Sequence, residues 1–276
     1  MLKNLKQYKY SKIRSEILNM NEIKNEKISF SINWLTSIFD FIQINDYKEP
    51  YGTTIRNNYE DGLEKLNMLY ELLTYPNYDE RVEEDKKVRD YSEKVTLGKF
   101  IQIYLNGCKN SKGLNHSKLE LNTYGCDDFV NRGGSWFDLF NWLYTSDNAI
   151  SNKPYRIDVG IDVKTNKNFT LELLYDHLIS NGLLKYFRNS LCFGSTKSNV
   201  YLCIYNNKIS HIQLDDKFNY RIEIRFRNEK ASWFIDNFIQ AQGDYSFIMN
   251  VVYELLNIKD FDEFKNIFQL ENEVKL

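Results

Sequence analysis

Residues 155–162 alternate strictly between apolar and polar side chains, and this stretch constrains the fold more than any other. It reads Tyr-Arg-Ile-Asp-Val-Gly-Ile-Asp, which is typical of a strand with one buried face. The apolar positions are Ile157, Val159 and Ile161, and the polar positions are Arg156, Asp158 and Asp162. Carboxylates beside a buried face are costly to desolvate unless a cation, often a divalent metal, lies over them. The stretch is therefore a candidate site.

Two later stretches, 201–208 and 220–227, repeat the alternation. The first places Tyr201, Cys203 and Tyr205 on one side, and the second does the same for Arg221, Glu223, Arg225 and Arg227. If the three strands share one sheet, neighbouring strands bring Asp158, Glu223 and Tyr205 within a few side-chain lengths of one another.

Such a face could break a phosphodiester bond. Carboxylates hold Mg²⁺ or Mn²⁺ through oxygen ligands, and the metal polarises a phosphate. A tyrosine hydroxyl beside it could attack phosphorus, while arginines neutralise the phosphate charge. The alternative is structural, because alternating Arg and Glu usually form an exposed cross-strand salt-bridge face. The chain also has 20 tyrosines, so a tyrosine on a strand is not specific. Both interpretations stay open at this level.

The rest of the chain predicts an α+β fold with a central, largely antiparallel sheet and flanking helices. Alternating runs predict strands at 28–44, 99–106, 118–122, 190–193, 199–206, 209–214 and 219–227. Helical spacing predicts helices at 60–75, 136–144, 170–182 and, in several pieces, between 231 and 268. Ser135 is the expected N-cap of the second helix. The charged run 79–94 is typical of a solvated helix face or a loop.

Composition narrows the class of protein. The chain has 276 residues, 42% of them hydrophobic, which is enough for one large domain or two small ones. It has no apolar run of about 18 residues and no signal-peptide core at its start, which predicts a cytoplasmic protein without a membrane partner. The formal net charge of −2 gives no global case for nucleic-acid binding, so any such binding needs a local basic patch.

Cysteine and histidine spacing predicts no zinc site and no disulfide framework. The four cysteines, Cys108, Cys126, Cys192 and Cys203, lack the CxxC spacing and are expected to be free, mostly buried thiols. The three histidines are isolated in the sequence, so we expect structural roles for them.

Four stretches, in order, resemble the replication initiation factors of rolling-circle plasmids and phages, a family that includes relaxases of integrative conjugative elements. The stretches are 119–126 with 136–140, Tyr155-Arg-Ile-Asp-Val-Gly-Ile-Asp162, Cys192-Phe-Gly-Ser-Thr-Lys-Ser through Lys208, and Tyr220-Arg-Ile-Glu-Ile-Arg-Phe-Arg227. The segment Ile32-Asn-Trp-Leu-Thr36 is similar to the family's opening strand. Together these motifs span about residues 30–240.

The resemblance implies an endonuclease core of the HUH type, without the His-hydrophobe-His signature. By position, Tyr205 resembles the nucleophile that nicks one DNA strand at an origin and stays joined to its 5′ phosphate, with Lys208 as the basic residue that follows it. Asp158, Glu223 and, less closely, Asp162 match acidic positions that bind a divalent metal, Mg²⁺ or Mn²⁺. For DNA contacts we expect four basic side chains, which are Arg221, Arg225, Lys197 and Arg188, with Lys185 nearby.

The implied partners are origin DNA, single-stranded or cruciform, a host helicase and a host polymerase. The implied domain plan is an N-terminal arm or short helix at 1–27, a nuclease domain at 28–240 and C-terminal helices at 241–276. Those last helices either pack on the sheet or form a homodimer, and both arrangements stay open.

The chain departs from the family pattern at three places. Cys203 stands where an arginine is common, Thr196 replaces another arginine, and two asparagines separate Tyr205 from Lys208 where one residue is usual. These departures keep an alternative open, namely an origin-binding or regulatory DNA-binding protein with the same fold and no catalysis. An unrelated α+β binding protein is the third interpretation.

Overall fold

A computed structural model describes residues 28–40, 67–73, 81–84, 91, 93–97, 100–105, 107, 116–145, 151–166, 168–178, 184–187, 190–206 and 219–270. The chain divides into two compact units. Unit 1 comprises Met1–Ser31, Val159–Arg225 and Asp244–Leu276, and unit 2 comprises Ile32–Asp158 and Phe226–Gly243. Strands β1 (Ile28–Asp40), β6 (Ser151–Val163) and β10 (Tyr220–Arg227) contribute residues to both units. The mixed α+β class with antiparallel strand pairing is confirmed.

In unit 2 the hydrogen-bonded strand order is β2 (Arg81–Glu84), β3 (Glu93–Leu97), β4 (Ile101–Leu105), β5 (Ser117–Leu121), β1 and β6. The pairings from β2 through β5 to β1 are antiparallel. The predicted strands at 99–106 and 118–122 are the adjacent pair β4 and β5, in which Ile101 lies opposite Leu121. Alternate side chains of β5 are buried, as the period of two requires, and in β4 Tyr104 is buried in addition to Ile101, Ile103 and Leu105.

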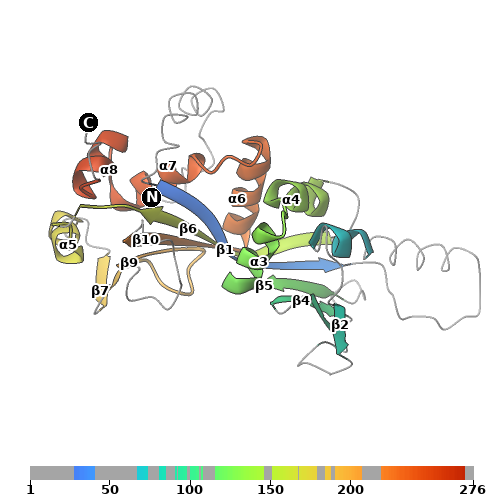
Figure 1. The fold of residues 1–276 in the computed structure, drawn as a ribbon. Coiled ribbons are helices and arrows are strands. Elements are labelled where there is room, and N and C mark those ends of the chain that lie inside the picture. The colour runs from blue at the N-terminus through green and yellow to red at the C-terminus, as the bar shows by residue number, and fades with distance from the viewer. Residues whose placement is uncertain are drawn as a thin grey trace, which may run out of the picture. The chain divides into compact units, whose positions relative to one another are not determined.

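Three labelled helices belong to unit 2, which are α3 (Thr123–Asn131), α4 (Trp136–Thr145) and α6 (Glu229–Gln240). Helices α4 and α6 pack against each other (Figure 1). Their contact is aromatic, because the Phe140 ring meets the rings of Phe234 and Phe238 at centroid distances of 6.5 and 5.6 Å. The predicted helix at 60–75 is described over 67–73, where Leu69, Tyr70 and Leu73 are buried.

In unit 1 the strand order is β6, β10, β9 (Val200–Asn206), β8 (Ser190–Phe193) and β7 (Leu184–Phe187). The helices of this unit are α5 (Leu171–Leu178), α7 (Phe247–Leu256) and α8 (Phe261–Ile267). The apolar sides of β9 and β10 are fully buried, at Leu202, Ile204, Ile222 and Ile224. Because successive side chains of a strand point to opposite faces, the polar side chains of β9 and β10 gather on the other face.

The structure corrects some predicted elements. The charged run 79–94 is neither a helix face nor only a loop, because β2 begins at Arg81 within it. Helix α3 and strand β7 were not predicted. Ser135 is confirmed as the N-cap of α4, since its Oγ accepts a hydrogen bond from Asp138 N at 3.2 Å. The predicted arm at 1–27 and strand at 209–214 lie outside the described residues. None of the helices in the described ranges is long and apolar enough to span a membrane.

Candidate active site

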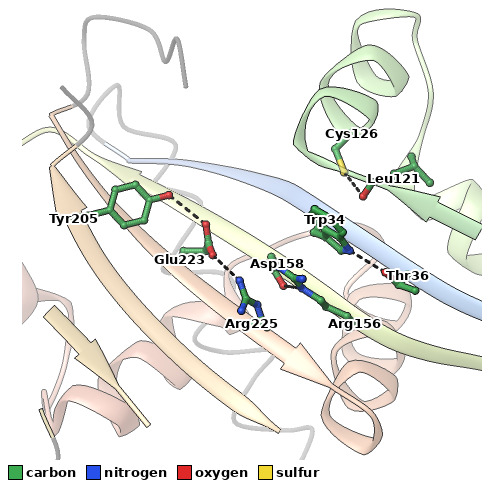
Figure 2. A network of polar contacts seen from close by, with 9 residues as sticks. All are labelled: Trp34, Thr36, Leu121, Cys126, Arg156, Asp158, Tyr205, Glu223 and Arg225. Atoms are coloured by element: carbon green, nitrogen blue, oxygen red, sulfur yellow. Dashed lines mark hydrogen bonds and ion pairs between the residues drawn. The ribbon is translucent and has the colours of Figure 1, made fainter. Parts of the chain in front are cut away.

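Tyr205 and Glu223 meet on the polar face of unit 1. Tyr205 lies near the end of β9 and Glu223 in the middle of β10, and these strands are neighbours. The Tyr205 hydroxyl donates a hydrogen bond to Glu223 Oε2 at 3.2 Å (Figure 2). Both side chains are half-buried, so each is still partly accessible to a molecule in the solvent. The structure thus brings together two of the residues that the sequence singled out.

The surroundings of Tyr205 keep its phenol protonated. Burial raises the pKa of Tyr205 above its ordinary value, and the charge of Glu223 raises it further, whereas Arg221 acts in the opposite direction. A neutral phenol is a weak nucleophile, so attack on phosphorus needs a base that removes its proton. Glu223 already accepts the hydrogen bond from that hydroxyl and is the group placed to do so.

Arg225 lies on the same face and contacts Glu223. Its Nη2 lies 3.4 Å from Glu223 Oε1, two residues away on β10 (Figure 2). Its guanidinium also lies over the Tyr201 ring, 5.7 Å from the centroid. Arg225 is half-buried, with a side chain 17% exposed, so its charge lies beside the carboxylate that accepts the Tyr205 hydrogen bond.

Asp162 and Arg221 form a buried ion pair in unit 1. Arg221 Nε and Nη2 donate to Asp162 Oδ1 and Oδ2, each at 2.7 Å, and Arg221 is only 2% exposed. Burial acts to lower the pKa of Arg221, but the hydrogen bonds and charge of Asp162 outweigh it and raise that pKa. Both were expected to bind ligands, Asp162 a metal and Arg221 a phosphate. In the structure each has the other as a partner, and the two ligand roles stay predictions.

Asp158 has a comparable partner in unit 2. Arg156 Nε donates to Asp158 Oδ1 at 2.8 Å, and Arg156 Nη2 donates to the second oxygen (Figure 2). The Arg156 guanidinium lies 4.3 Å from the centroid of Trp34, whose Nε1 donates to Thr36 Oγ1. No role is predicted for Arg156 from the sequence. Its position two residues before Asp158, on the same strand face, is the signal that could have found the pair.

The three predicted carboxylates do not form a metal-binding group. Among the described residues, no set of three or more His, Cys, Asp and Glu side chains is arranged to hold a metal ion. Asp162 fits metal binding poorly, because both its oxygens accept hydrogen bonds from Arg221. Glu223 fits better, because its contacts with Tyr205 and Arg225 are long, at 3.2 and 3.4 Å. A cation held by one or two carboxylates would need phosphate oxygens and water to complete its ligands.

The remaining predicted basic residues are only partly described. Lys197 is exposed in the turn between β8 and β9, where Gly194 adopts a φ of +84°. Its backbone N–H donates to Ser195 Oγ at 3.3 Å, which holds the turn and leaves the ammonium group at the surface. Arg188 and Lys208 lie outside the described residues, as does the side chain of Lys185.

Comparison with known proteins supports the family resemblance. Residues 188–273 match the family model described as "Replication initiation factor". The chain is 22% identical over 191 residues to NicK of Bacillus subtilis (strain 168), a protein provisionally named a DNA relaxase. That match covers 59% of this chain and 52% of the relative, so the chain spans about half the length of this curated relative.

A solved structure shares the fold. The rolling circle replication initiator protein from Geobacillus stearothermophilus matches with a TM-score of 0.58 at 16% identity, over 89% of this chain and 93% of that one. The predicted resemblance to the replication initiation factors is confirmed. The residues matched by the family model include Tyr205, Glu223 and Arg225, whereas Asp158 and Asp162 precede them.

Proposed function

We propose that this chain, whose resemblance to the replication initiation factors is confirmed, nicks one DNA strand at an origin and initiates rolling-circle replication. The observation that carries the proposal is the hydrogen bond from the Tyr205 hydroxyl to Glu223 on the polar face of β9 and β10. Both residues lie within the part of the chain that the family model matches.

The proposed reaction transfers a phosphoryl group from DNA to Tyr205. The Tyr205 oxygen attacks the phosphorus of the scissile phosphodiester, and its proton passes to Glu223. The bond from phosphorus to the 3′ oxygen breaks, and that oxygen takes up a proton to become the 3′ hydroxyl. The 5′ phosphate stays on the tyrosine, so the bond energy is kept. Arg225 would offset the negative charge that collects on the phosphate oxygens.

A divalent cation, Mg²⁺ or Mn²⁺, is the proposed cofactor, and its chemistry would be to polarise the scissile phosphate. Glu223 is the carboxylate that we propose for it. Asp158 and Asp162 fit less well, because Arg156 and Arg221 each donate to both oxygens of their carboxylate partner. The proposed partners are single-stranded or cruciform origin DNA, with a host helicase to unwind the duplex and a host polymerase to extend the 3′ hydroxyl.

The test is a nicking assay on a supercoiled plasmid that carries the chain's own gene neighbourhood, with and without Mn²⁺. We expect nicked circles with covalently attached protein for the wild type and none for Tyr205→Phe. The matched control is Tyr201→Phe, which changes a tyrosine on the same face of β9 and should keep the adduct. An unchanged adduct in Tyr205→Phe would contradict the nucleophile assignment.

A second function is favoured by the pairing of carboxylates with arginines. Asp158 and Asp162 each bind an arginine through both oxygens, which would suit a protein that keeps the fold and has lost metal-assisted catalysis. Such a protein would bind origin DNA and regulate replication. A wild-type chain that shifts origin DNA on a gel and never nicks it, at any Mn²⁺ concentration, would establish this alternative.

A further inference from the structure

Two cysteines face each other across β8 and β9 in unit 1. The antiparallel register pairs Cys192 directly with Cys203, and their Sγ atoms lie 2.8 Å apart. A disulfide bond measures about 2.05 Å, so these thiols are close to bonding distance but reduced. Directly opposed residues of antiparallel strands have Cα atoms about 4.5–5.5 Å apart, which lies within the range that disulfides span. The register of β8 and β9 is therefore compatible with a cross-strand disulfide.

The two thiols differ in access and in acidity. Cys192 is buried, with Ser190 Oγ 3.8 Å from its sulfur, and Cys203 is half-buried on the side of β9 that carries Tyr201 and Tyr205. The hydrogen bond from the Cys203 thiol lowers the pKa of Cys192, and the same contact raises the pKa of Cys203. A thiolate beside a protonated thiol is the arrangement of a nucleophilic cysteine with a resolving partner.

We propose that Cys192 and Cys203 form a redox modification site, which a hydroperoxide converts reversibly from a dithiol to a cross-strand disulfide. The Cys192 thiolate attacks one oxygen of hydrogen peroxide, giving a sulfenic acid and hydroxide, which takes up a proton to become water. The Cys203 sulfur then attacks the Cys192 sulfur, and the Cys203 proton leaves with the sulfenic hydroxyl as a second water. In sum, two thiols and one peroxide give one disulfide and two waters. The proposal goes beyond the proposed nicking function and does not depend on it.

Cys126 supplies a contrast within the same chain. It lies in α3, is 1% exposed, and its Sγ is 3.8 Å from the carbonyl oxygen of Leu121. Burial raises the pKa of the Cys126 thiol well above its ordinary value. A buried, protonated thiol reacts slowly with peroxide, so Cys126 is the matched control for the pair.

The test is peptide mapping of the full chain after treatment with hydrogen peroxide. Trypsin cleaves after Arg188, Lys197 and Lys208, so the two cysteines fall in separate peptides, 189–197 and 198–208. We expect a linked pair of these peptides, about 2 Da lighter than the sum of the two thiol peptides. Dithiothreitol should separate them. Cys126→Ser should leave the link unchanged, and Cys192→Ser or Cys203→Ser should abolish it.

Three results would overturn the proposal. They are full alkylation of both thiols after peroxide, sulfinic or sulfonic acid on one cysteine without a link, and a link to Cys108 or Cys126 instead. The wild type treated with peroxide in urea is the control for variants that fail to fold. Only the folded wild type should give the link between peptides 189–197 and 198–208 in preference to other links. A chain that forms the link but never nicks DNA would refute the proposed function and leave this inference standing.

Discussion

At the scale of single residues, Glu223 has the most specific chemical role that we propose. Its Oε2 accepts the hydrogen bond from Tyr205, and a raised pKa at Tyr205 makes removal of that proton necessary. Glu223→Gln keeps the size and the hydrogen-bonding oxygen but cannot take up a proton. We expect single-turnover nicking to fall about 10²- to 10⁴-fold. Origin-DNA affinity, measured by fluorescence anisotropy, should stay close to that of the wild type.

The control for that experiment is Glu120→Gln. Glu120 lies on β5 in unit 2 and pairs with Lys118 at 2.9 Å. The substitution therefore removes a carboxylate that has no proposed part in nicking. A Glu223→Gln chain that nicks at the rate of Glu120→Gln would show that another group accepts the Tyr205 proton.

The Asp162–Arg221 pair gives a prediction about folding stability. Arg221→Met would leave the Asp162 carboxylate buried without its cation, and we expect a loss of about 3–5 kcal/mol in the free energy of unfolding. The double variant Asp162→Leu, Arg221→Met should regain most of that loss, because it buries no charge. Urea denaturation of the three chains measures both effects. If Arg221→Met alone costs less than about 1 kcal/mol, the pair is not the buried contact described here.

Sequence alternation predicted the side of the strand for each residue of the site, but not its partner. Tyr205, Glu223 and Arg225 lie on polar faces, as a period of two requires. The pairing of Arg221 with Asp162 depends on how β10 aligns with β6, and a shift of one residue would reverse which side chains meet. That register is set by the whole sheet and cannot be deduced from the two segments alone.

At the scale of secondary-structure elements, the Tyr144–Ser37 hydrogen bond ties α4 to β1 in unit 2. The buried Tyr144 hydroxyl donates to Ser37 Oγ at 2.6 Å. Burial raises the pKa of Tyr144 above its ordinary value of 10.0, an effect that outweighs the opposite influence of Ser37. The folded chain therefore holds a neutral phenol at a pH at which the unfolded chain has already ionised it.

This difference predicts a pH-dependent stability. The contribution of the neutral Tyr144 phenol to the free energy of unfolding is complete below about pH 10. It is lost as the pH rises above that value, by about 1.4 kcal/mol per pH unit. Tyr144→Phe removes the titrating group and the hydrogen bond. We expect it to be less stable than the wild type at neutral pH by about 1–2 kcal/mol, with a gap that closes as the pH approaches about 11. Urea denaturation at several pH values measures this, and a gap independent of pH would contradict it.

Helix α3 shows why one element was missed although its ends are marked in the sequence. Asn122 caps its start, with Oδ1 accepting from Gly125 N at 3.0 Å. Gly133, at a φ of +88°, ends it, and the N–H groups of Gly133 and Gly134 donate to Val130 O and Phe129 O. The nine residues between these signals carry a weak apolar pattern, which does not by itself predict a helix.

At the scale of the whole molecule, the predicted domain plan stays a prediction, and the division into compact units is a separate property. Each compact unit is assembled from separate segments, and the helices after Asp244 belong to the same unit as Val159–Arg225. Composition marks a boundary only where a linker interrupts the chain, and strands shared between the units leave no such mark.

The net charge of the whole chain predicts how the proposed DNA binding should depend on salt. With 36 basic against 38 acidic residues, the chain offers no broad positive field, so we expect the affinity to come from a few local contacts, for which Lys197 and Arg225 are candidates. On single-stranded DNA each phosphate contact contributes about 0.7 to the slope of log Kd against log salt. Three contacts predict a slope of about 2, far below that of strongly basic DNA-binding proteins.

Anisotropy titrations of a single-stranded origin oligonucleotide at several KCl concentrations measure this slope. Lys197→Gln should lower it by about 0.7, because it removes an exposed ammonium group. Lys265→Gln is the matched control, since Lys265 is also exposed but lies on α8, paired with Asp262. Equal changes of the slope in both variants would mean that DNA affinity depends only on the total charge of the chain. A loss confined to Lys197 would place the DNA strand along the turn between β8 and β9, at the end of β9 that lies away from Tyr205.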